Sequence, residues 1–294
     1  MLTELSNQMA DLVSTASRSV VQVQGHRRPA SGLAWADDVV VTTMRLLGRE
    51  DGLHVRTESA EAEAQLLGWD PATGIAVLRA PGLALQPLTA ARTDARVGHL
   101  AMAIARSWSN HITASAGVVS VIGGPMPTSR RRAIEQVIRT TAPMHSGFAG
   151  GAFLDMTGGL IGLTTAMEIR GLGVVVPTAI VQQAVTGVLK HGGIKRGYLG
   201  IAGQPVVLPE NQRDAEGREE ALLVAGVSAG SPAARAGILV GDIVIAFDGQ
   251  PVESPEDLLD LLAGDRVGRS ISLRIIRGGQ AQDVAVTVGE RPSA

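Results

Sequence analysis

Short apolar segments, most of them rich in valine and isoleucine, alternate with glycine and turn residues from Ser19 to about Pro177. Many short segments at this spacing predict the strands of an antiparallel barrel or sandwich. The predicted strands cover residues 19–24, 39–43, 75–79, 101–105, 117–122, 160–165 and 173–176.

A helix is predicted where this pattern stops, because residues 177–190 place apolar side chains along one helical face. Gly192 and Gly193 follow and begin a linker. A chain of 294 residues is long enough for two domains, since a single core rarely grows beyond about 250–300 residues. The predicted parts are an N-terminal amphipathic helix over 1–18, a β-rich domain over 19–192 and a second domain over 193–294.

The second domain mixes strands with short helices. Strands are predicted at 197–202 and 221–227, with a polar insertion at 210–220 between them. Caps and turns are readable as well, because serine before proline begins helices and paired Asp-Gly or Gly-Gly residues close hairpins. Helix starts are predicted at Ser231-Pro232 and at Ser254-Pro255 with Asp257, and hairpin turns at Asp248-Gly249 and Gly278-Gly279.

The N-terminal segment places Leu2, Leu5, Met9, Leu12 and Val13 at helical spacing. It has neither the cationic start nor the unbroken apolar stretch of a secretory signal, and no apolar run in the chain reaches transmembrane length. The sequence as written therefore predicts a cytoplasmic protein without a membrane span. A periplasmic or other extracytoplasmic location is the alternative if the sequence is a trimmed piece.

Composition excludes several classes of function. A net charge of −2 and only seven aromatic residues give little support for nucleic-acid binding. The absence of cysteine excludes disulfides, thiolate metal sites and a cysteine nucleophile. The six histidines show no paired ligand spacing, so we predict no metal site and no cofactor, with an ion-binding barrel kept as a minor alternative.

Several motifs in the second domain resemble the PDZ domain of bacterial HtrA proteins. Upstream, a further series resembles, in order, the landmarks of the HtrA protease domain. The PDZ motifs are Gly197-Tyr198-Leu199-Gly200-Ile201, Ala229-Gly230-Ser231-Pro232-Ala233-Ala234, Ala236-Gly237-Ile238 and Gly241-Asp242-Ile243; the protease landmarks are Ala30-Ser31-Gly32-Leu33, Val40-Val41-Thr42, Ile75-Ala76-Val77-Leu78, Val97-Gly98, Gly117-Val118-Val119-Ser120 and residues 147–151.

The resemblance implies a mainly β fold: a trypsin-like double antiparallel β-barrel followed by an α+β PDZ domain, with a short N-terminal helix. It also locates the catalytic triad. The family's T-N-A-H-V segment aligns with 42–46, which puts Arg45 at the position of the histidine. The D-L-A-V-L segment begins here with Gly74, and the G-N-S-G-G segment reads with Ala149 in place of the serine.

This set of residues lacks the groups that acyl transfer requires. Alanine has no hydroxyl to attack with, a guanidinium has no lone pair to accept a proton, and glycine cannot orient an imidazole. The glycines around Ala149 are retained, so Gly147, Phe148 and Ala149 are predicted to keep an oxyanion-hole-like backbone that could hold a carbonyl or carboxylate. We therefore expect a pseudoprotease of the HtrA type.

Weak or non-standard peptidase activity is the alternative. Ser146 beside His145 is the candidate for rescue, but adjacent side chains of an extended segment point to opposite faces, so we interpret them as a turn serine and a surface histidine. Asp70 with Pro71 is interpreted as an Asx-type turn rather than a displaced catalytic carboxylate.

The resemblance extends to the whole PDZ peptide-binding motif. PDZ domains add a ligand's C-terminal strand to a sheet edge and capture its carboxylate with backbone N–H groups. The resemblance assigns this site to Tyr198, Leu199, Gly200 and Ile201, with leucines of the helix from Ser254 as the opposite wall. The leucines assigned to this wall are Leu258 and Leu262.

The expected partners are peptides or protein C-termini, unfolded proteins, or an active HtrA homologue, in a chaperone, adaptor or regulatory role. The family habit of trimerising through N-terminal aromatic residues makes a homo-oligomer an expectation, although residues 1–19 contain none. The arginine runs are interpreted as solvated loop residues rather than as a site for an anionic partner. They are Arg27-Arg28 and Arg130-Arg131-Arg132.

Overall fold

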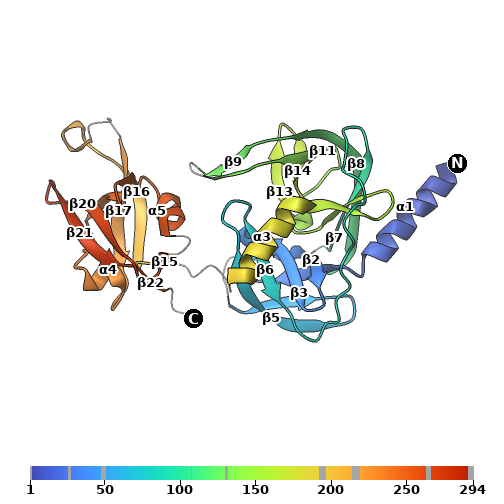
Figure 1. Cartoon of the computed structure of the whole chain (residues 1–294), viewed down its shortest axis with the longest axis horizontal. Helices are drawn as coiled ribbons and strands as arrows, with labels where there is room; N and C mark the ends of the chain where they lie inside the picture. The colour runs from blue at the N-terminus through green and yellow to red at the C-terminus, as the bar shows by residue number, and fades with distance from the viewer. Residues whose placement is uncertain are drawn as a thin grey trace. The chain divides into compact units, whose positions relative to one another are not determined.

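The computed structural model describes residues 2–25, 28–47, 51–106, 108–129, 132–191, 197–213, 219–262 and 266–290. The chain divides into two compact units, Met1–Gly193 and Ile194–Ala294 (Figure 1). Strands dominate both units, and the fold confirms the prediction of a trypsin-like double barrel followed by an α+β PDZ domain. None of the helices in the described part of the chain combines the length and hydropathy that a membrane crossing requires.

The first barrel closes in the order β1-β2-β3-β6-β5-β4, with every neighbouring pair antiparallel. Alternation along β3 explains why its valines form a strand: Val39 and Val41 enter one buried cluster and Val40 enters another. The strands are β1 (Val20–Gln24), β2 (Ala30–Ala36), β3 (Val39–Thr43), β4 (Leu53–Arg56), β5 (Glu61–Trp69) and β6 (Ile75–Arg79).

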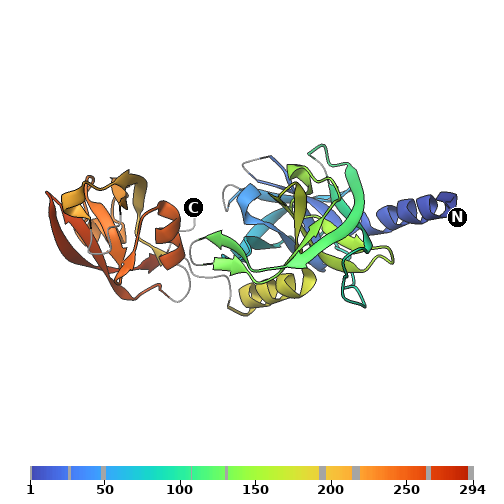
Figure 2. The ribbon, with the colours of Figure 1, turned by 90° about the horizontal axis from the view of Figure 1, so that it is seen from above.

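The second barrel closes in the order β11-β14-β13-β12-β7-β8. Helix α3 (Thr178–His191) follows β14 and contacts β5 and β6 of the first barrel as well as β13 and β14 of the second (Figure 2). The strands are β7 (Leu100–Arg106), β8 (Ile112–Gly123), β11 (Val137–Thr140), β12 (Ala152–Asp155), β13 (Leu160–Ile169) and β14 (Leu172–Pro177).

A two-stranded hairpin between β8 and β11 joins β9 (Met126–Ser129) to β10 (Arg132–Ile134). Arg132, which the sequence suggested was a loop residue, begins β10, whereas Arg130 and Arg131 lie outside the described residues. Arg27 also lies outside them, as do Gly192 and Gly193 of the predicted linker.

The N-terminal helix α1 (Leu2–Ala16) packs only by its C-terminal end. Ala16 is buried and Leu12 and Val13 pack on the same core, whereas Leu2 at the other end is exposed. Arg106 of β7 fixes this junction, because its guanidinium donates to the carbonyl oxygens of Ser17 (3.1 Å) and Val20 (2.8 Å). Burial lowers the pKa of Arg106, and the nearby Glu58 partly offsets that effect.

The PDZ unit is built on a sheet in the order β16-β17-β18-β20-β21, with β19 paired to β18. The predicted strand at 197–202 is interrupted: it divides into β15 and β16 because Gly200 adopts φ +80° between them. The elements are β15 (Gly197–Tyr198), β16 (Ile201–Val207), η2 (Glu210–Gln212), β17 (Glu220–Val227), α4 (Pro232–Arg235), β18 (Ile243–Phe247), β19 (Gln250–Pro251), α5 (Pro255–Leu262), β20 (Ser270–Arg277), β21 (Gln280–Thr287) and β22 (Gly289–Glu290).

The predicted turns and caps of this unit have the expected geometry. Asp248 and Gly249 have φ +47° and +76°, so positive φ at both central residues makes a tight hairpin between β18 and β19. Ser231 accepts from the N–H of Ala234 (3.2 Å) and begins α4. The Ser254 N–H donates to Asp257 Oδ2 (3.0 Å), while the Asp257 N–H donates to Ser254 Oγ (3.2 Å), which is the reciprocal capping box.

Candidate active site and peptide-binding loop

The segment that corresponds to the nucleophile lies between β11 and β12. His145 caps a single 3-10 turn, η1 (Ser146–Phe148), and Ala149 follows it with its side chain completely buried. Gly150 adopts φ +86°, and a Cβ there would lie 2.1 Å from the carbonyl oxygen of Ser31. Only glycine fits at this turn, so the loop keeps its shape although Ala149 carries no hydroxyl.

The three backbone N–H groups assigned to an oxyanion hole all donate within the loop. The Gly147 N–H donates to His145 Nδ1 (3.0 Å), the Phe148 N–H to the His145 carbonyl (2.9 Å) and the Ala149 N–H to the Ser146 carbonyl (3.2 Å). In this conformation none of the three points a free donor at an incoming carbonyl or carboxylate. The oxyanion-hole role stays a prediction that requires this loop to open.

Hydrogen bonds from Ser31 of the first barrel hold this loop in place. The Ser31 N–H donates to the Ala149 carbonyl (3.0 Å), and Ser31 Oγ donates to the Gly147 carbonyl (2.8 Å). Ser31 itself accepts from the N–H of Arg106 (3.0 Å), and its carbonyl accepts from Thr42 Oγ1 (2.6 Å). Sequence reasoning singled out Ser31 only as a landmark, because a buried serine that bonds across strands has no sequence signature.

Arg45 and Gly74 lie on segments that the structure brings together. The Met44 N–H donates to the Gly74 carbonyl (2.8 Å) at the point where β3 and β6 end. Arg45 lies on the short helix α2 (Met44–Leu47), where its side chain is exposed to solvent. Thr42 donates to Ser31, which donates to the Ala149 carbonyl, so hydrogen bonds connect the segments that carry the three predicted triad positions.

Gly74 occupies the end of a tight turn that Asp70 stabilises. Asp70 Oδ2 accepts from both the N–H (2.8 Å) and the hydroxyl (2.6 Å) of Thr73, which is the geometry of an Asx turn. Gly74 adopts φ +71°, and a Cβ there would meet nothing within 4 Å. The turn therefore uses the Asp70 carboxylate for local structure and leaves open space where an orienting carboxylate would stand.

His145 and Ser146 are both exposed and do not form a catalytic pair. His145 Nδ1 is occupied as the acceptor for Gly147, and no hydrogen bond joins the His145 ring to Ser146 in the described part of the chain. The ring instead packs against Trp108 (centroids 5.7 Å apart) and edge-on against Phe148 (5.1 Å). Arg28 lies 5.0 Å over the Trp108 ring and extends this stack.

The loop of the PDZ unit that is predicted to bind a carboxylate differs, because it leaves backbone N–H groups without an acceptor in the described part of this unit. Its carbonyl groups are used, since the Ser228 N–H donates to Gly200 O (2.8 Å) and the Ala233 N–H to Leu199 O (2.9 Å). The N–H groups of Leu199 and Gly200 donate to no other described residue. Adjacent free N–H groups at a positive-φ glycine are a general means of binding a carboxylate.

Helix α5 places most of its leucines in the core of the PDZ unit. Leu258, Leu261 and Leu262 are buried with Leu199, whereas Leu259 is 62% exposed. Ile201 on β16 is only partly buried against this cluster. β16 is an edge strand of the sheet, so its outer side remains available to a further strand.

An ion pair that sequence reasoning missed closes the turn after α4. Asp242 is buried and accepts two hydrogen bonds from Arg277, both of 2.7 Å. It accepts a third from the Leu239 N–H (2.8 Å). Hydrogen bonding to Arg277 lowers the pKa of Asp242, against the opposing effect of burial. No spacing rule links residues this far apart along the chain.

Comparison with known families finds one family match in each of the two compact units. Residues 30–163 match the trypsin-like peptidase domain family, and residues 197–288 match the PDZ domain family.

Curated relatives include two proteins described as probable periplasmic serine endoprotease DegP-like. The one from Pseudomonas fluorescens is 29% identical over 265 residues, which covers 87% of this chain and 55% of the relative. The one from Halomonas elongata is 28% identical over 283 residues and covers 92% of this chain and 59% of the relative. This chain thus spans little more than half the length of these relatives. Their descriptions place them in the periplasm and give the predicted cytoplasmic location no support.

Solved structures cover almost the whole chain. The HtrA-type protease AlgW with a tripeptide is 27% identical, has a TM-score of 0.57 and covers 97% of this chain and 98% of its own. The serine endoprotease from Yersinia pestis is 27% identical with a TM-score of 0.55, at 97% and 98% coverage. With both domains matched in this order, the chain belongs to the HtrA-type family of trypsin-like serine proteases with a PDZ domain.

Proposed function

We propose that this chain is a catalytically inactive HtrA-type protein that binds peptides or protein C-termini through its PDZ domain. The observation that carries the proposal is the set of residues at the triad positions: Arg45, Gly74 and Ala149 supply neither nucleophile nor base. The occupied N–H groups of the Ala149 loop add support, because removing a single oxyanion-hole donor already costs roughly 10²–10³ in kcat.

The binding half of the proposal rests on the PDZ loop. Leu199 and Gly200 present free N–H groups beside the edge strand β16, as capture of a terminal carboxylate requires. AlgW, a structural relative, was solved with a tripeptide. A protein that holds client C-termini without cutting them fits a chaperone, an adaptor or a regulator of an active homologue, and unfolded proteins are the natural clients of such a role.

Casein digestion and a fluorogenic peptide assay test the catalytic half. Purified protein is expected to release product no faster than the buffer blank, and Ser146→Ala is expected to leave that rate unchanged. Turnover that disappears in Ser146→Ala would establish the alternative, a non-standard peptidase, and contradict the proposal.

Binding of paired peptides tests the other half. A peptide with a free C-terminus is expected to bind, whereas the same peptide with a C-terminal amide loses the carboxylate and binds at least about tenfold more weakly. Equal affinity of the two peptides would remove the terminal carboxylate from the recognition. Calorimetric titration of the full chain measures both.

A further inference from the structure

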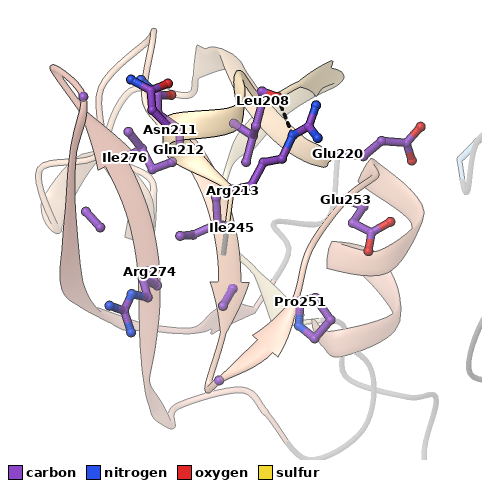
Figure 3. Close-up of a pocket in the computed structure, with 14 residues that line it drawn as sticks. Leu208, Asn211, Gln212, Arg213, Glu220, Ile245, Pro251, Glu253, Arg274 and Ile276 are labelled. Atoms are coloured by element: carbon purple, nitrogen blue, oxygen red, sulfur yellow. Dashed lines mark hydrogen bonds between the residues drawn. The ribbon is translucent and has the colours of Figure 1, made fainter. Parts of the chain in front are cut away.

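A pocket of about 510 Å³ lies in the PDZ unit, and none of its lining residues belongs to the carboxylate-binding loop or to α5 (Figure 3). Its volume falls in the range of small-ligand sites, roughly 300–1,000 Å³. It is lined by residues from the β16–β17 connection, from β18 and β19, and from β20 and β21. The residues used below are Leu208, Asn211, Gln212, Arg213, Ile245, Arg274 and Ile276.

The pocket lies on the face of the sheet opposite the main core. On β18, Val244 and Phe247 belong to the core that α5 covers, whereas Ile245 packs on a small separate cluster. Leu208 and Ile276 are buried in that second cluster. The register shift in β18 between Val244 and Ala246 places Ile245 on this face, and together with Leu208 and Ile276 it forms the apolar floor of the pocket.

The wall formed by the polar insertion is held in place. The Leu208 N–H donates to the Glu219 carbonyl (2.6 Å), which closes the base of the insertion. Arg213 bridges the same base, because it pairs with Glu219 Oε1 (2.8 Å) and donates through Nε to the Leu208 carbonyl (3.3 Å; Figure 3). The pocket is therefore built before any ligand arrives.

Polar groups around this floor have no partner within the described part of the chain. Arg274 projects from β20 and makes no hydrogen bond or ion pair with a described residue; Asp283, its cross-strand neighbour in register, does not pair with it. The carboxamides of Asn211 and Gln212 are likewise unpaired there. Carboxamides both donate and accept, as a peptide group requires of its partner, and a guanidinium fits a carboxylate.

We propose that this pocket is a second binding site, for an internal peptide segment in which an aliphatic side chain is followed by Glu or Asp. The aliphatic side chain covers Leu208, Ile245 and Ile276, the acidic side chain pairs with Arg274, and the carboxamides of the insertion bond the peptide backbone. Glu220 and Glu253 line the pocket away from Arg274 (Figure 3). The site requires no free C-terminus, which distinguishes it from the carboxylate-binding loop.

Isoleucine methyl NMR on the full chain separates the two sites, because Ile245 and Ile276 line the pocket whereas Ile201 lies beside the carboxylate loop. The probe is N-acetyl-Ile-Glu-amide, which is blocked at both ends. Its addition is expected to shift the methyl signals of Ile245 and Ile276 and to leave Ile201 unchanged. The matched probe N-acetyl-Ile-Gln-amide is expected to bind about tenfold more weakly, since it loses a charge-assisted hydrogen bond.

Arg274→Gln removes the cation from an exposed strand position. It is expected to lower the affinity for the acidic probe by the same factor, about tenfold. Arg269→Gln, which changes an exposed arginine outside the pocket, serves as the control and leaves the affinity unchanged. Absence of shifts at Ile245 and Ile276, shifts at Ile201 in their place, or equal affinity in Arg274→Gln would each overturn the proposal. A free-acid peptide that fails to shift Ile201 contradicts only the function proposed for the carboxylate loop.

Discussion

Two glycine-containing loops of this chain present backbone N–H groups of the kind that bind a carbonyl or carboxylate. They differ in whether groups of the chain itself already accept hydrogen bonds from those N–H groups. In residues 145–151 the N–H groups of Gly147, Phe148 and Ala149 all find acceptors inside the loop. In the PDZ loop the N–H groups of Leu199 and Gly200 find none among the described residues. An anion site therefore depends less on the presence of glycine than on the absence of a competing internal acceptor.

The difference has a local cause in each loop. His145 supplies a ring nitrogen two residues before Gly147, where it acts as a cap for the 3-10 turn. The PDZ loop has no such side chain, because Gly200 lies against Ser231, whose hydroxyl is already engaged with the N–H of Ala234. One loop is closed by its own sequence, and the other stays open for a ligand.

The largest expected effect is at Gly200. A Cβ at this position would lie 2.2 Å from the Cβ of Ser231, and φ +80° disfavours any larger residue. Gly200→Val should displace the loop and remove both carboxylate bonds, which lowers affinity for a free-C-terminus peptide by about 100-fold or more. Titration calorimetry of the full chain measures the change.

Gly230→Ala provides the matched control for that variant. Gly230 also has a positive φ (+67°), but a Cβ there meets nothing within 4 Å, so it carries the conformational cost without the clash. Peptide affinity should stay within a factor of two or three of the parent, because the carboxylate loop is untouched. If Gly200→Val bound as tightly as this control, the groove would be assigned to the wrong residues.

The next largest effect is expected from a variant that removes the hydrogen bonds holding the Ala149 loop closed. Ser31→Ala removes the hydroxyl that donates to the Gly147 carbonyl and accepts from the Arg106 N–H, both inside the barrel. Loss of these buried partners should lower the free energy of unfolding by about 1–3 kcal/mol. All three tryptophans, Trp35, Trp69 and Trp108, lie in the unit that contains Ser31, so their fluorescence during urea unfolding measures this unit alone.

Ser59→Ala is the control, since Ser59 is an exposed loop serine whose hydroxyl makes no bond with a described residue. It should leave the tryptophan transition unchanged. Equal stability of Ser31→Ala and the control would mean that the barrel does not hold the loop closed.

Much of the fold and of the candidate sites was predictable from the sequence, and the features that were not have a physical explanation. The sequence located β3 and β6 to the residue, because each is a short, continuously buried apolar run that polar or turn residues bound. Local chemistry also predicted the Asp248-Gly249 turn and both serine caps, which depend on neighbours in sequence. The triad positions followed from a motif resemblance. The structure then placed their three segments together.

Contacts between residues far apart in the chain escaped prediction. Ser31 bonds to Gly147, and Asp242 to Arg277, across separations that no local pattern encodes. The break at Gly200 was also missed, because apolar residues on both sides continue a strand-like pattern through it. The pocket was unpredictable for the same reason, since segments far apart in the sequence of the PDZ unit contribute to it.

Acid should weaken the PDZ unit through Asp242. The folded-state pKa of Asp242 is lowered from its ordinary value of 3.8 by Arg277, so its stabilising contribution is complete above that value and is lost as pH falls through the lower, folded-state pKa. Asp242→Asn should cost about 1–2 kcal/mol at pH 7, at the low end for charged hydrogen bonds because Arg277 is partly exposed.

The methyl signals of Ile238 and Ile275, both in the core of the PDZ unit, report unfolding of this unit during denaturant titration. The gap between parent and Asp242→Asn should be largest near neutral pH and should close as the solution is acidified below about pH 4. A gap that persisted unchanged in acid would mean that packing, rather than the charge of Asp242, stabilises this turn.

The smallest effects are expected where two lost triad residues are put back. Arg45→His changes an exposed position on α2 and should alter the free energy of unfolding by no more than about 0.5 kcal/mol. Gly74→Asp introduces a side chain into open space at φ +71°, a conformation that aspartate tolerates better than most residues, and should cost about 1 kcal/mol. Tryptophan-monitored unfolding checks both, and a loss above about 2 kcal/mol at Gly74 would show that its link to Met44 has been broken. The hydrogen bonds that close the Ala149 loop involve neither Arg45 nor Gly74, so both variants should leave this loop closed.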